Sequence, residues 1–200
     1  MKTLNTSDWT WINATERSSI SDREIIIHTT PDTDFWRGTY YGLEYNNAPA
    51  VVVASDEQYW TFKAKVAFAS HTHFDQCGLF IYQNENNWMK SGIEYQNNGF
   101  QQLFSVVTNS GYSDWSMVNF DRTTQTMYYR LSRRGCDFLL ENSIDGTDFS
   151  MMRMFHMFHA DESVQFGFFA SSPGDSSFAA HFSQFEWTEC CWKEHGAPRF

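Results

Sequence analysis

The residues best suited to chemistry lie in one short segment, residues 88–94, which has the composition of a β-strand. Side chains two positions apart in a strand share a face, with Cα atoms about 6.6 Å apart. Trp88, Lys90, Gly92 and Glu94 therefore share one face. The indole can stack on a sugar ring, the ammonium and carboxylate can bond to its hydroxyl groups, and the glycine leaves space. The alternative is an exposed face whose Lys–Glu pair contributes about 0–1 kcal/mol.

A second carboxylate stands beside an indole at Asp114 and Trp115, after the expected turn at residues 109–111. This pair suits a sugar in the same way, because the carboxylate accepts from two hydroxyls and the indole supplies a stacking face. The alternative is a local turn in which Asp114 bonds to its own backbone.

Two arginines, Arg130 and Arg153, lie in strand-like segments among apolar residues. A buried charge without a partner is costly. We expect these arginines to pair with Glu94, Asp114 or Asp75 across one concave face, or else to extend their charged ends to solvent. The full set of predicted ligand-binding residues is Trp88, Lys90, Glu94, Asp114, Trp115, Arg130, Arg153 and Asp75.

Three pairs of metal-ligating side chains are close in sequence: Asp32 and Asp34, His71 and His73, and His156 and His159. A calcium site needs several more oxygen ligands than the aspartates supply, and a zinc site needs more ligands than two histidines. We therefore expect no metal and no cofactor, and we assign Phe35 and Trp36 a role in sealing the core.

The elements that must position these residues are short strands separated by turns. Residues 97–99, 134–135, 145–146 and 173–174 contain the Asn, Asp, Gly and Pro typical of turns. Strand-like segments, some alternating and some continuously apolar, span residues 59–68, 77–82, 104–108, 127–133, 164–170 and 178–185. Residues 151–159 lack a polar helical face and suggest a strand followed by a loop. This pattern predicts an all-β sandwich or barrel.

Composition narrows the class of protein. The chain has 200 residues, a net charge of −10 and 18% aromatic residues, which predicts one domain over residues 1–200. The acidic surface argues against nucleic-acid binding. We expect no membrane association, because there is no 18-residue apolar run. We expect a cytoplasmic location, because the N-terminal residues lack the apolar core of a signal peptide. In that location the four cysteines are expected to be thiols.

The order of several short motifs resembles a known family. These motifs are Asp34-Phe35-Trp36, Tyr41-Gly42, Asp75-Gln76-Cys77-Gly78-Leu79, residues 87–95, residues 105–108, Ser113-Asp114-Trp115-Ser116, residues 143–146, Met152-Arg153 and residues 167–173. Over about residues 9–187 they resemble the family labelled regulation-of-enolase proteins, in the concanavalin A-like lectin and glucanase superfamily. The resemblance implies a two-sheet jelly-roll sandwich with one concave sheet, and Cys77 stands where Ala is more usual.

The superfamily also suggests a search for hydrolase carboxylates. Its glucanases commonly carry a Glu-x-Asp strand motif, which this chain lacks, and Glu186 and Glu189 would face opposite sides of a strand. We therefore expect a saccharide-binding domain in preference to an enzyme. The alternatives are a glycoside hydrolase or lyase that uses Glu94 with a second carboxylate such as Asp114, and a regulatory module that binds a metabolic enzyme, as the family label implies.

Overall fold

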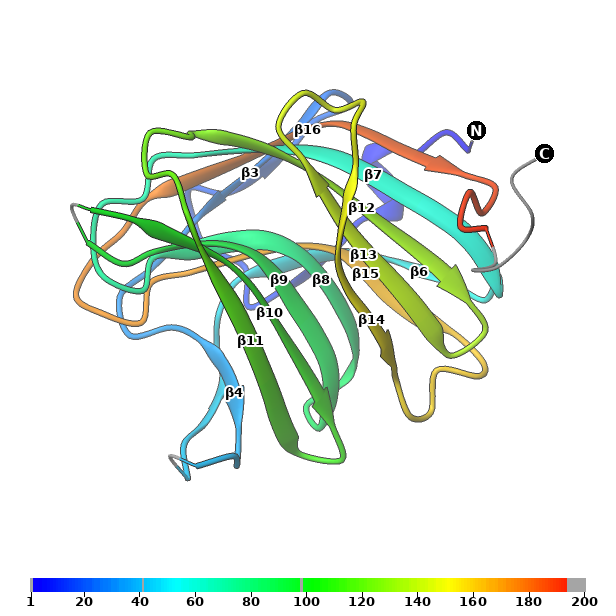
Figure 1. The fold of residues 1–200 in the computed structure, drawn as a ribbon, viewed down its shortest axis with the longest axis horizontal. Helices are drawn as coiled ribbons and strands as arrows, with labels where there is room; N and C mark the ends of the chain where they lie inside the picture. Colours follow the sequence, from blue (N-terminus) through cyan, green and yellow to red (C-terminus); the bar gives the residue numbers. More distant parts are fainter. Residues whose placement is uncertain (1, 41, 98, 194–200) are drawn as a thin grey trace.

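The computed structural model describes residues 2–40, 42–97 and 99–193. Two seven-stranded antiparallel sheets stack as a sandwich, and a separate two-stranded hairpin lies against one of them (Figure 1). The fold is the concanavalin A-like sandwich that the sequence predicts. No helix in the described ranges is long and apolar enough to cross a membrane.

The sheet that carries the candidate residues is called the concave sheet here. Its strands, in spatial order, are β1 (Thr10–Ile12), β6 (Ala50–Ser55), β15 (Val164–Ser171), β8 (Gln76–Asn84), β9 (Asn87–Tyr95), β10 (Gln101–Asn109) and β11 (Tyr112–Phe120). Strands β8 to β11 arch over the hairpin, which is formed by β4 (Phe35–Arg37) and β5 (Glu44–Asn46) (Figure 1).

The second layer is called the opposite sheet. Its strands are β14 (Ser150–His156), β13 (Asp137–Ser143), β12 (Thr126–Arg134), β7 (Tyr59–Phe68), β16 (Ala179–Thr188), β3 (Glu24–His28) and β2 (Ser19–Ile20). A 3-10 turn, η1 (Thr6–Asp8), precedes β1. Residues 151–159 form most of β14 and the loop after it, as their composition predicts.

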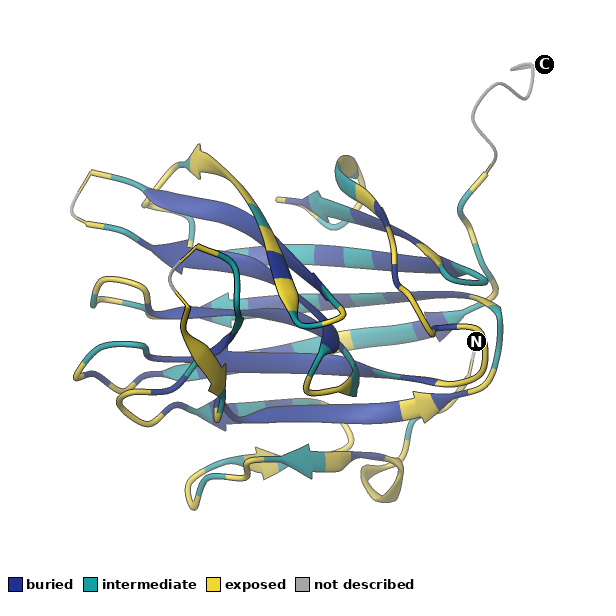
Figure 2. Ribbon diagram, turned by 90° about the horizontal axis from the view of Figure 1, so that it is seen from below, coloured by how far each residue is buried: buried dark blue, intermediate teal, exposed yellow. Residues whose placement is uncertain are grey.

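The main core fills the space between the two sheets and is rich in aromatic rings. The indole of Trp60 in β7 stacks on Phe166 in β15 with ring centroids 4.2 Å apart. Stacked aromatic pairs of this kind add to the free energy gained from burial. The central strands of both sheets are consequently buried along most of their length (Figure 2).

A second, smaller apolar cluster lies on the other face of the concave sheet, under the hairpin. Phe35 of β4 contacts Phe80 of β8, with centroids 4.6 Å apart, and Trp88 of β9 at 5.8 Å. This cluster explains why residues 77–82 form a continuous apolar run, since β8 is covered on both faces. Phe35 and Trp36 thus seal an apolar cluster, although it is not the core between the sheets.

Candidate functional site

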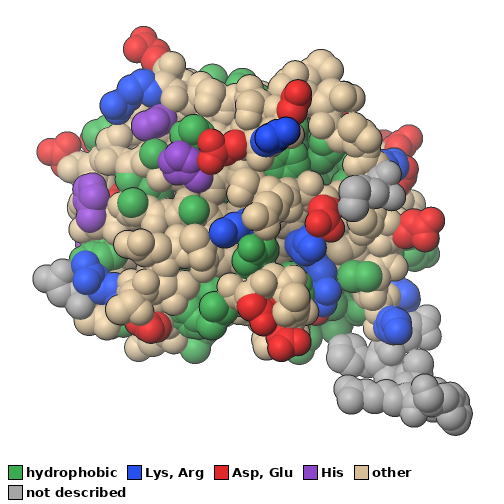
Figure 3. Space-filling model, turned by 90° about the horizontal axis from the view of Figure 1, so that it is seen from above, with side chains coloured by type: hydrophobic (Ala, Val, Ile, Leu, Met, Phe, Trp, Pro, Cys, Tyr) green, Lys and Arg blue, Asp and Glu red, His purple; other side chains and the backbone are tan. Residues whose placement is uncertain are grey.

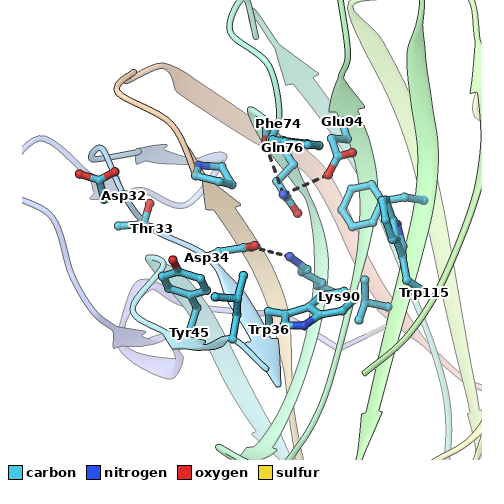
Figure 4. A pocket seen from close by; sticks show the side chains of 14 residues that line it. Asp32, Thr33, Asp34, Trp36, Tyr45, Phe74, Gln76, Lys90, Glu94 and Trp115 are labelled. Atoms are coloured by element: carbon cyan, nitrogen blue, oxygen red, sulfur yellow. Dashed lines mark hydrogen bonds and ion pairs between the residues drawn. The ribbon is translucent and has the colours of Figure 1, made fainter. Parts of the chain in front are cut away.

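A cavity of about 350 Å³ opens between the hairpin and the concave sheet (Figure 4). Its lining combines charged groups, an amide and aromatic rings from six separate stretches of chain and from Pro173. The lining residues are Asp32, Thr33, Asp34, Trp36, Leu43, Tyr45, Phe74, Gln76, Lys90, Glu94, Phe104, Val106, Trp115 and Pro173.

An ion pair joins the two walls of the cavity. Lys90 Nζ of β9 donates to Asp34 Oδ1, just before β4, at 2.5 Å. The Lys90 side chain is only 3% exposed, and the Asp34 side chain 18%. The same Asp34 oxygen accepts the amide of Phe35 at 2.8 Å. Because the ammonium lies in the floor and the carboxylate in the hairpin wall, this pair holds the hairpin over the sheet.

Glu94 lies two positions further along the same face of β9 and is almost fully buried. Its Oε2 accepts from Gln76 Nε2 at 3.1 Å, and its Oε1 accepts from Gln96 Nε2 at 2.5 Å. Burial raises the pKa of Glu94 to about 7, and the negative charge of Asp34 adds to the rise. The nearby Lys90 ammonium and the hydrogen bond from Gln96 act in the opposite direction and lower this pKa. The floor therefore holds a carboxyl group that changes charge near neutral pH.

Gln76 of β8 is directly opposite Glu94 in the strand pairing and is 2% exposed. Its Nε2 donates to Glu94 Oε2 and also to the carbonyl of Phe74 at 3.3 Å. The Phe74 carbonyl oxygen can only accept a hydrogen bond, so the Gln76 side-chain atom next to it must be the amide nitrogen. The amide oxygen Oε1 therefore points away from Phe74 and Glu94. That buried oxygen has no hydrogen-bond partner within the protein.

Aromatic rings surround this polar floor. Trp36 of the hairpin and Trp115 of β11 meet edge to face with centroids 6.2 Å apart. Tyr45 and Phe74 are more than a third exposed, while Phe104 is buried below. The site can thus offer apolar ring faces at the sides and hydrogen-bonding groups at the bottom, which is the composition of a small-molecule site.

The structure brings Lys90, Glu94 and Trp115 of the predicted set together in this cavity. Strand alternation places Lys90 and Glu94 on the concave face, while Met89 and Ile93 lie in the core between the sheets. The parity argument from the sequence therefore holds for these two charged residues.

Trp88 shares that face but is not available to a ligand. It is fully buried under Phe35 of the hairpin, and its Nε1 donates to the carbonyl of Glu85 at 3.2 Å. Gly92 does not leave room for a ring either, since a Cβ there would lie 1.9 Å from the carbonyl oxygen of Cys77 in β8. The missing side chain at Gly92 instead lets two strands approach closely.

The two arginines lie elsewhere. Arg130 projects from the outward face of the opposite sheet, where it forms a bidentate pair with Glu141 at 2.6 and 2.7 Å. Figure 3 shows that face, on which basic and acidic side chains are interspersed. Arg153 of β14 donates to Asp114 Oδ1 at 2.7 Å and to Ser105 Oγ at 3.2 Å. The predicted Arg153–Asp114 contact exists, but the pair lies on the other face of β11 from Trp115.

Asp75 is also outside the cavity. It is fully buried and accepts from the hydroxyls of Ser172 at 2.9 Å and Ser176 at 2.5 Å, and from the amides of His71 and Thr72. Through these four hydrogen bonds, the Asp75 carboxylate joins two loops. The expected ligand role at Asp75 is thus replaced by a structural one.

Sequence reasoning missed Gln76, Trp36 and Tyr45, and considered Asp34 only for metal. The Asp34–Lys90 contact spans 56 positions of chain and the Gln76–Glu94 contact spans 18. A short sequence pattern cannot predict contacts between segments so far apart in the chain. Of the sequence arguments, only the motif resemblance included the segments that contain Asp34 and Gln76.

The histidine pairs have other neighbours. His73 stacks on Phe74, and His156 Nδ1 lies 2.7 Å from Asp137 Oδ1. Within the described ranges, the structure places no three His, Cys, Asp or Glu side chains where they could hold a metal ion.

Comparison with known proteins adds to this geometry. Residues 11–190 match the family described as proteins of unknown function, DUF1349. The chain belongs to this family. A relative of this chain in sequence is regulation of enolase protein 1 from Saccharomyces cerevisiae, which is 25% identical over 187 residues, covering 94% of this chain and 92% of that protein.

Solved structures show the same fold. A functionally unknown protein from Saccharomyces cerevisiae aligns with a TM-score of 0.85 and 24% identity over 93% of this chain and 98% of that chain. The GH43 protein BlXynB from Bacillus licheniformis aligns with a TM-score of 0.70 and 16% identity, over 94% of this chain but 38% of that chain. The DUF1349 chain therefore corresponds to one part of the GH43 protein, and this likeness shows the fold alone.

Proposed function

We propose that the cavity under the β4–β5 hairpin binds a saccharide or a sugar-like metabolite. The observation that supports this most strongly is a polar cluster beneath the rings of Trp36 and Trp115. Its members are Gln76, Lys90 and Glu94, which are buried, and Asp34, which is partly exposed. Sugars combine apolar ring faces with closely spaced hydroxyl groups. A floor of donors and acceptors with aromatic sides matches both features of such a ligand.

The size of the cavity is consistent with a small ligand. About 350 Å³ is at the lower end of the range for small-molecule sites, and suits one or two sugar rings. A xylan β-1,4-xylosidase from Bacillus halodurans has the same fold over part of its length, so we include the xylose series among the first ligands to test.

A glycan array followed by titration calorimetry tests the proposal. We expect one or more saccharides to bind wild-type protein, and Trp115→Ala to weaken that binding at least tenfold, because it removes a partly buried ring from the cavity wall. Tyr59→Ala is the matched control, since Tyr59 is an exposed aromatic residue at the start of β7, outside the cavity. Folded protein that binds nothing on either assay would contradict the proposal.

A second candidate function is glycoside hydrolysis. Two carboxyl groups, Glu94 and Asp34, line the same cavity, and the raised pKa of Glu94 suits a general acid near neutral pH. Asp34 is ion-paired with the Lys90 ammonium and would supply the second carboxyl group that such a reaction needs. Release of a chromophore from aryl xylosides and glucosides, abolished by Glu94→Gln, would support this function; no turnover would exclude it for those substrates.

A third candidate is a regulatory module that binds a metabolic enzyme. The name of the yeast relative suggests enolase, and large apolar side chains are exposed along the edge strands: Met117 and Val118 in β11, and Met151 and Met154 in β14. Purified enolase mixed with this protein should then comigrate on gel filtration, and Val118→Lys should abolish the complex. Separate elution at micromolar concentrations of both would count against it.

A further inference from the structure

We propose that Gln76 determines the specificity of the cavity, which accepts a neutral sugar that donates a hydroxyl to Gln76 Oε1 and rejects sugar acids. This inference rests on the proposed saccharide-binding function and identifies the chemical class of the sugar. Three features of the site support it: an acceptor left without a donor, an amide that cannot rotate, and an excess of carboxyl groups over cations.

The first feature is the unpaired acceptor. Gln76 lines the cavity at 2% exposure, and its Oε1 has no partner within the protein. Because a buried acceptor left unpaired is costly, a ligand that supplies a donor there should bind more tightly than one that does not. Hydroxyl groups of a sugar are suitable donors, whereas ether oxygens and carboxylates are not.

The second feature is the fixed orientation of the amide. Rotating it by 180° would place Oε1 against the carbonyl oxygen of Phe74 and against Glu94. The Phe74 carbonyl carries no proton in any state, so this arrangement is repulsive at every pH. Gln76 therefore presents an acceptor to the ligand and cannot adapt by presenting its NH₂ group instead. Figure 4 shows the Gln76 amide nitrogen directed toward Glu94 and Phe74.

The third feature is the charge of the lining. Its carboxyl groups are those of Asp32, Asp34 and Glu94, and its cation is the ammonium of Lys90. The one ammonium is already engaged by Asp34 at 2.5 Å. A ligand carboxylate would therefore approach Gln76 Oε1 and two or three carboxyl groups without a cation to receive it. Since like charges repel strongly in a poorly hydrated site, a uronic acid should bind more weakly than its neutral parent.

Titration calorimetry with a fixed set of probes tests the inference. The probes are methyl β-D-xylopyranoside and methyl β-D-glucopyranoside, each monodeoxy form of the two, and the glucuronide that corresponds to the glucoside. For wild-type protein we expect one deoxy position to weaken binding by about 10- to 100-fold, because that analogue leaves the acceptor without a donor. The glucuronide should bind at least tenfold more weakly than the glucoside.

Gln76→Met separates recognition from folding. Methionine has a similar length and no acceptor of comparable strength, so this variant should bind the parent glycoside and the critical deoxy analogue with equal affinity. Gln101→Met is the matched control, because Gln101 is a buried glutamine whose amide donates to two backbone carbonyls outside the cavity. This control should keep the wild-type discrimination, and thermal unfolding will confirm that both variants are folded.

Two results would overturn the inference while leaving saccharide binding intact. One is equal affinity of wild-type protein for the parent glycoside and all of its deoxy forms. The other is a folded Gln76→Met variant that discriminates as wild type does. If no neutral glycoside of the set binds while the glucuronide does, the assigned sugar class is wrong; if no probe binds at all, the proposed saccharide function fails with it.

Discussion

Burial of Glu94 should make the stability of this protein depend on pH in a way that one substitution removes. Glu94 is 4% exposed, and the pKa of its carboxyl group rises from 4.5 to about 7 in the folded protein, chiefly through desolvation. Below pH 4.5 the group is protonated in both folded and unfolded states. Between pH 4.5 and 7 unfolding releases a proton, so the folded state loses stability as the pH rises.

The size of the effect follows from the two pKa values. Each pH unit of difference corresponds to about 1.4 kcal/mol. Between pH 5 and pH 8, wild-type protein should therefore lose about 2–3 kcal/mol of unfolding free energy through Glu94 alone. Glutamine carries no charge at either pH, so Glu94→Gln should not show this loss. Any cost of rearranging the amides of Gln76 and Gln96 would be the same at both pH values.

Urea unfolding at pH 5, 6, 7 and 8 provides the measurement. The quantity to compare is the unfolding free energy of Glu94→Gln minus that of wild type, in which all other titrating groups cancel. This difference should increase by about 2–3 kcal/mol from pH 5 to pH 8. Glu85→Gln serves as the control, since Glu85 is exposed, and its difference from wild type should be constant. Parallel curves for wild type and Glu94→Gln would refute the reasoning, because they would mean that Glu94 ionises as freely in the folded protein as in the unfolded chain.

Three further substitutions should change stability. Gly92→Ala places a Cβ 1.9 Å from a backbone oxygen, so this substitution should cost more than about 3 kcal/mol of stability in thermal unfolding or prevent folding. Gly174→Ala is the control and should be tolerated in the same assay, because the nearest atom to its Cβ would be 3.9 Å away. Arg133 is fully buried and donates to backbone carbonyls of three loops, so Arg133→Met should lower the urea-unfolding free energy by about 3–5 kcal/mol. Asp75→Asn should cost about 1–3 kcal/mol in the same assay, because an amide cannot accept from all four donors.

The strands could be predicted from the sequence because their signals are local. Alternation in residues 59–68 places every second side chain in the core, and β7 has the same limits in the structure. The apolar run at residues 77–82 indicated a strand buried on both faces, and β8 is such a strand. Turn residues such as Asp145 and Gly146 follow β13 as expected.

The same local rule placed Lys90 and Glu94 on one face, because alternation depends only on backbone geometry. Alternation alone could not predict which other segments of the chain pack on that face. Trp88 obeys the alternation yet is buried, since the hairpin that contains Phe35 packs on it from 53 positions earlier in the chain. Arg130 satisfied the sequence criteria for a site residue but projects from the opposite sheet, where Glu141 neutralises it.

The sequence by itself determined the all-β class, the turns and the face on which the charged pair of β9 lies, since side-chain periodicity and turn chemistry act over a few residues. Only the tertiary structure decided the composition of the cavity. Asp34 meets Lys90, and Gln76 meets Glu94, through the packing of a hairpin and the register of paired strands. Contacts of this kind depend on how distant segments bury their apolar faces together, which no short stretch of sequence encodes.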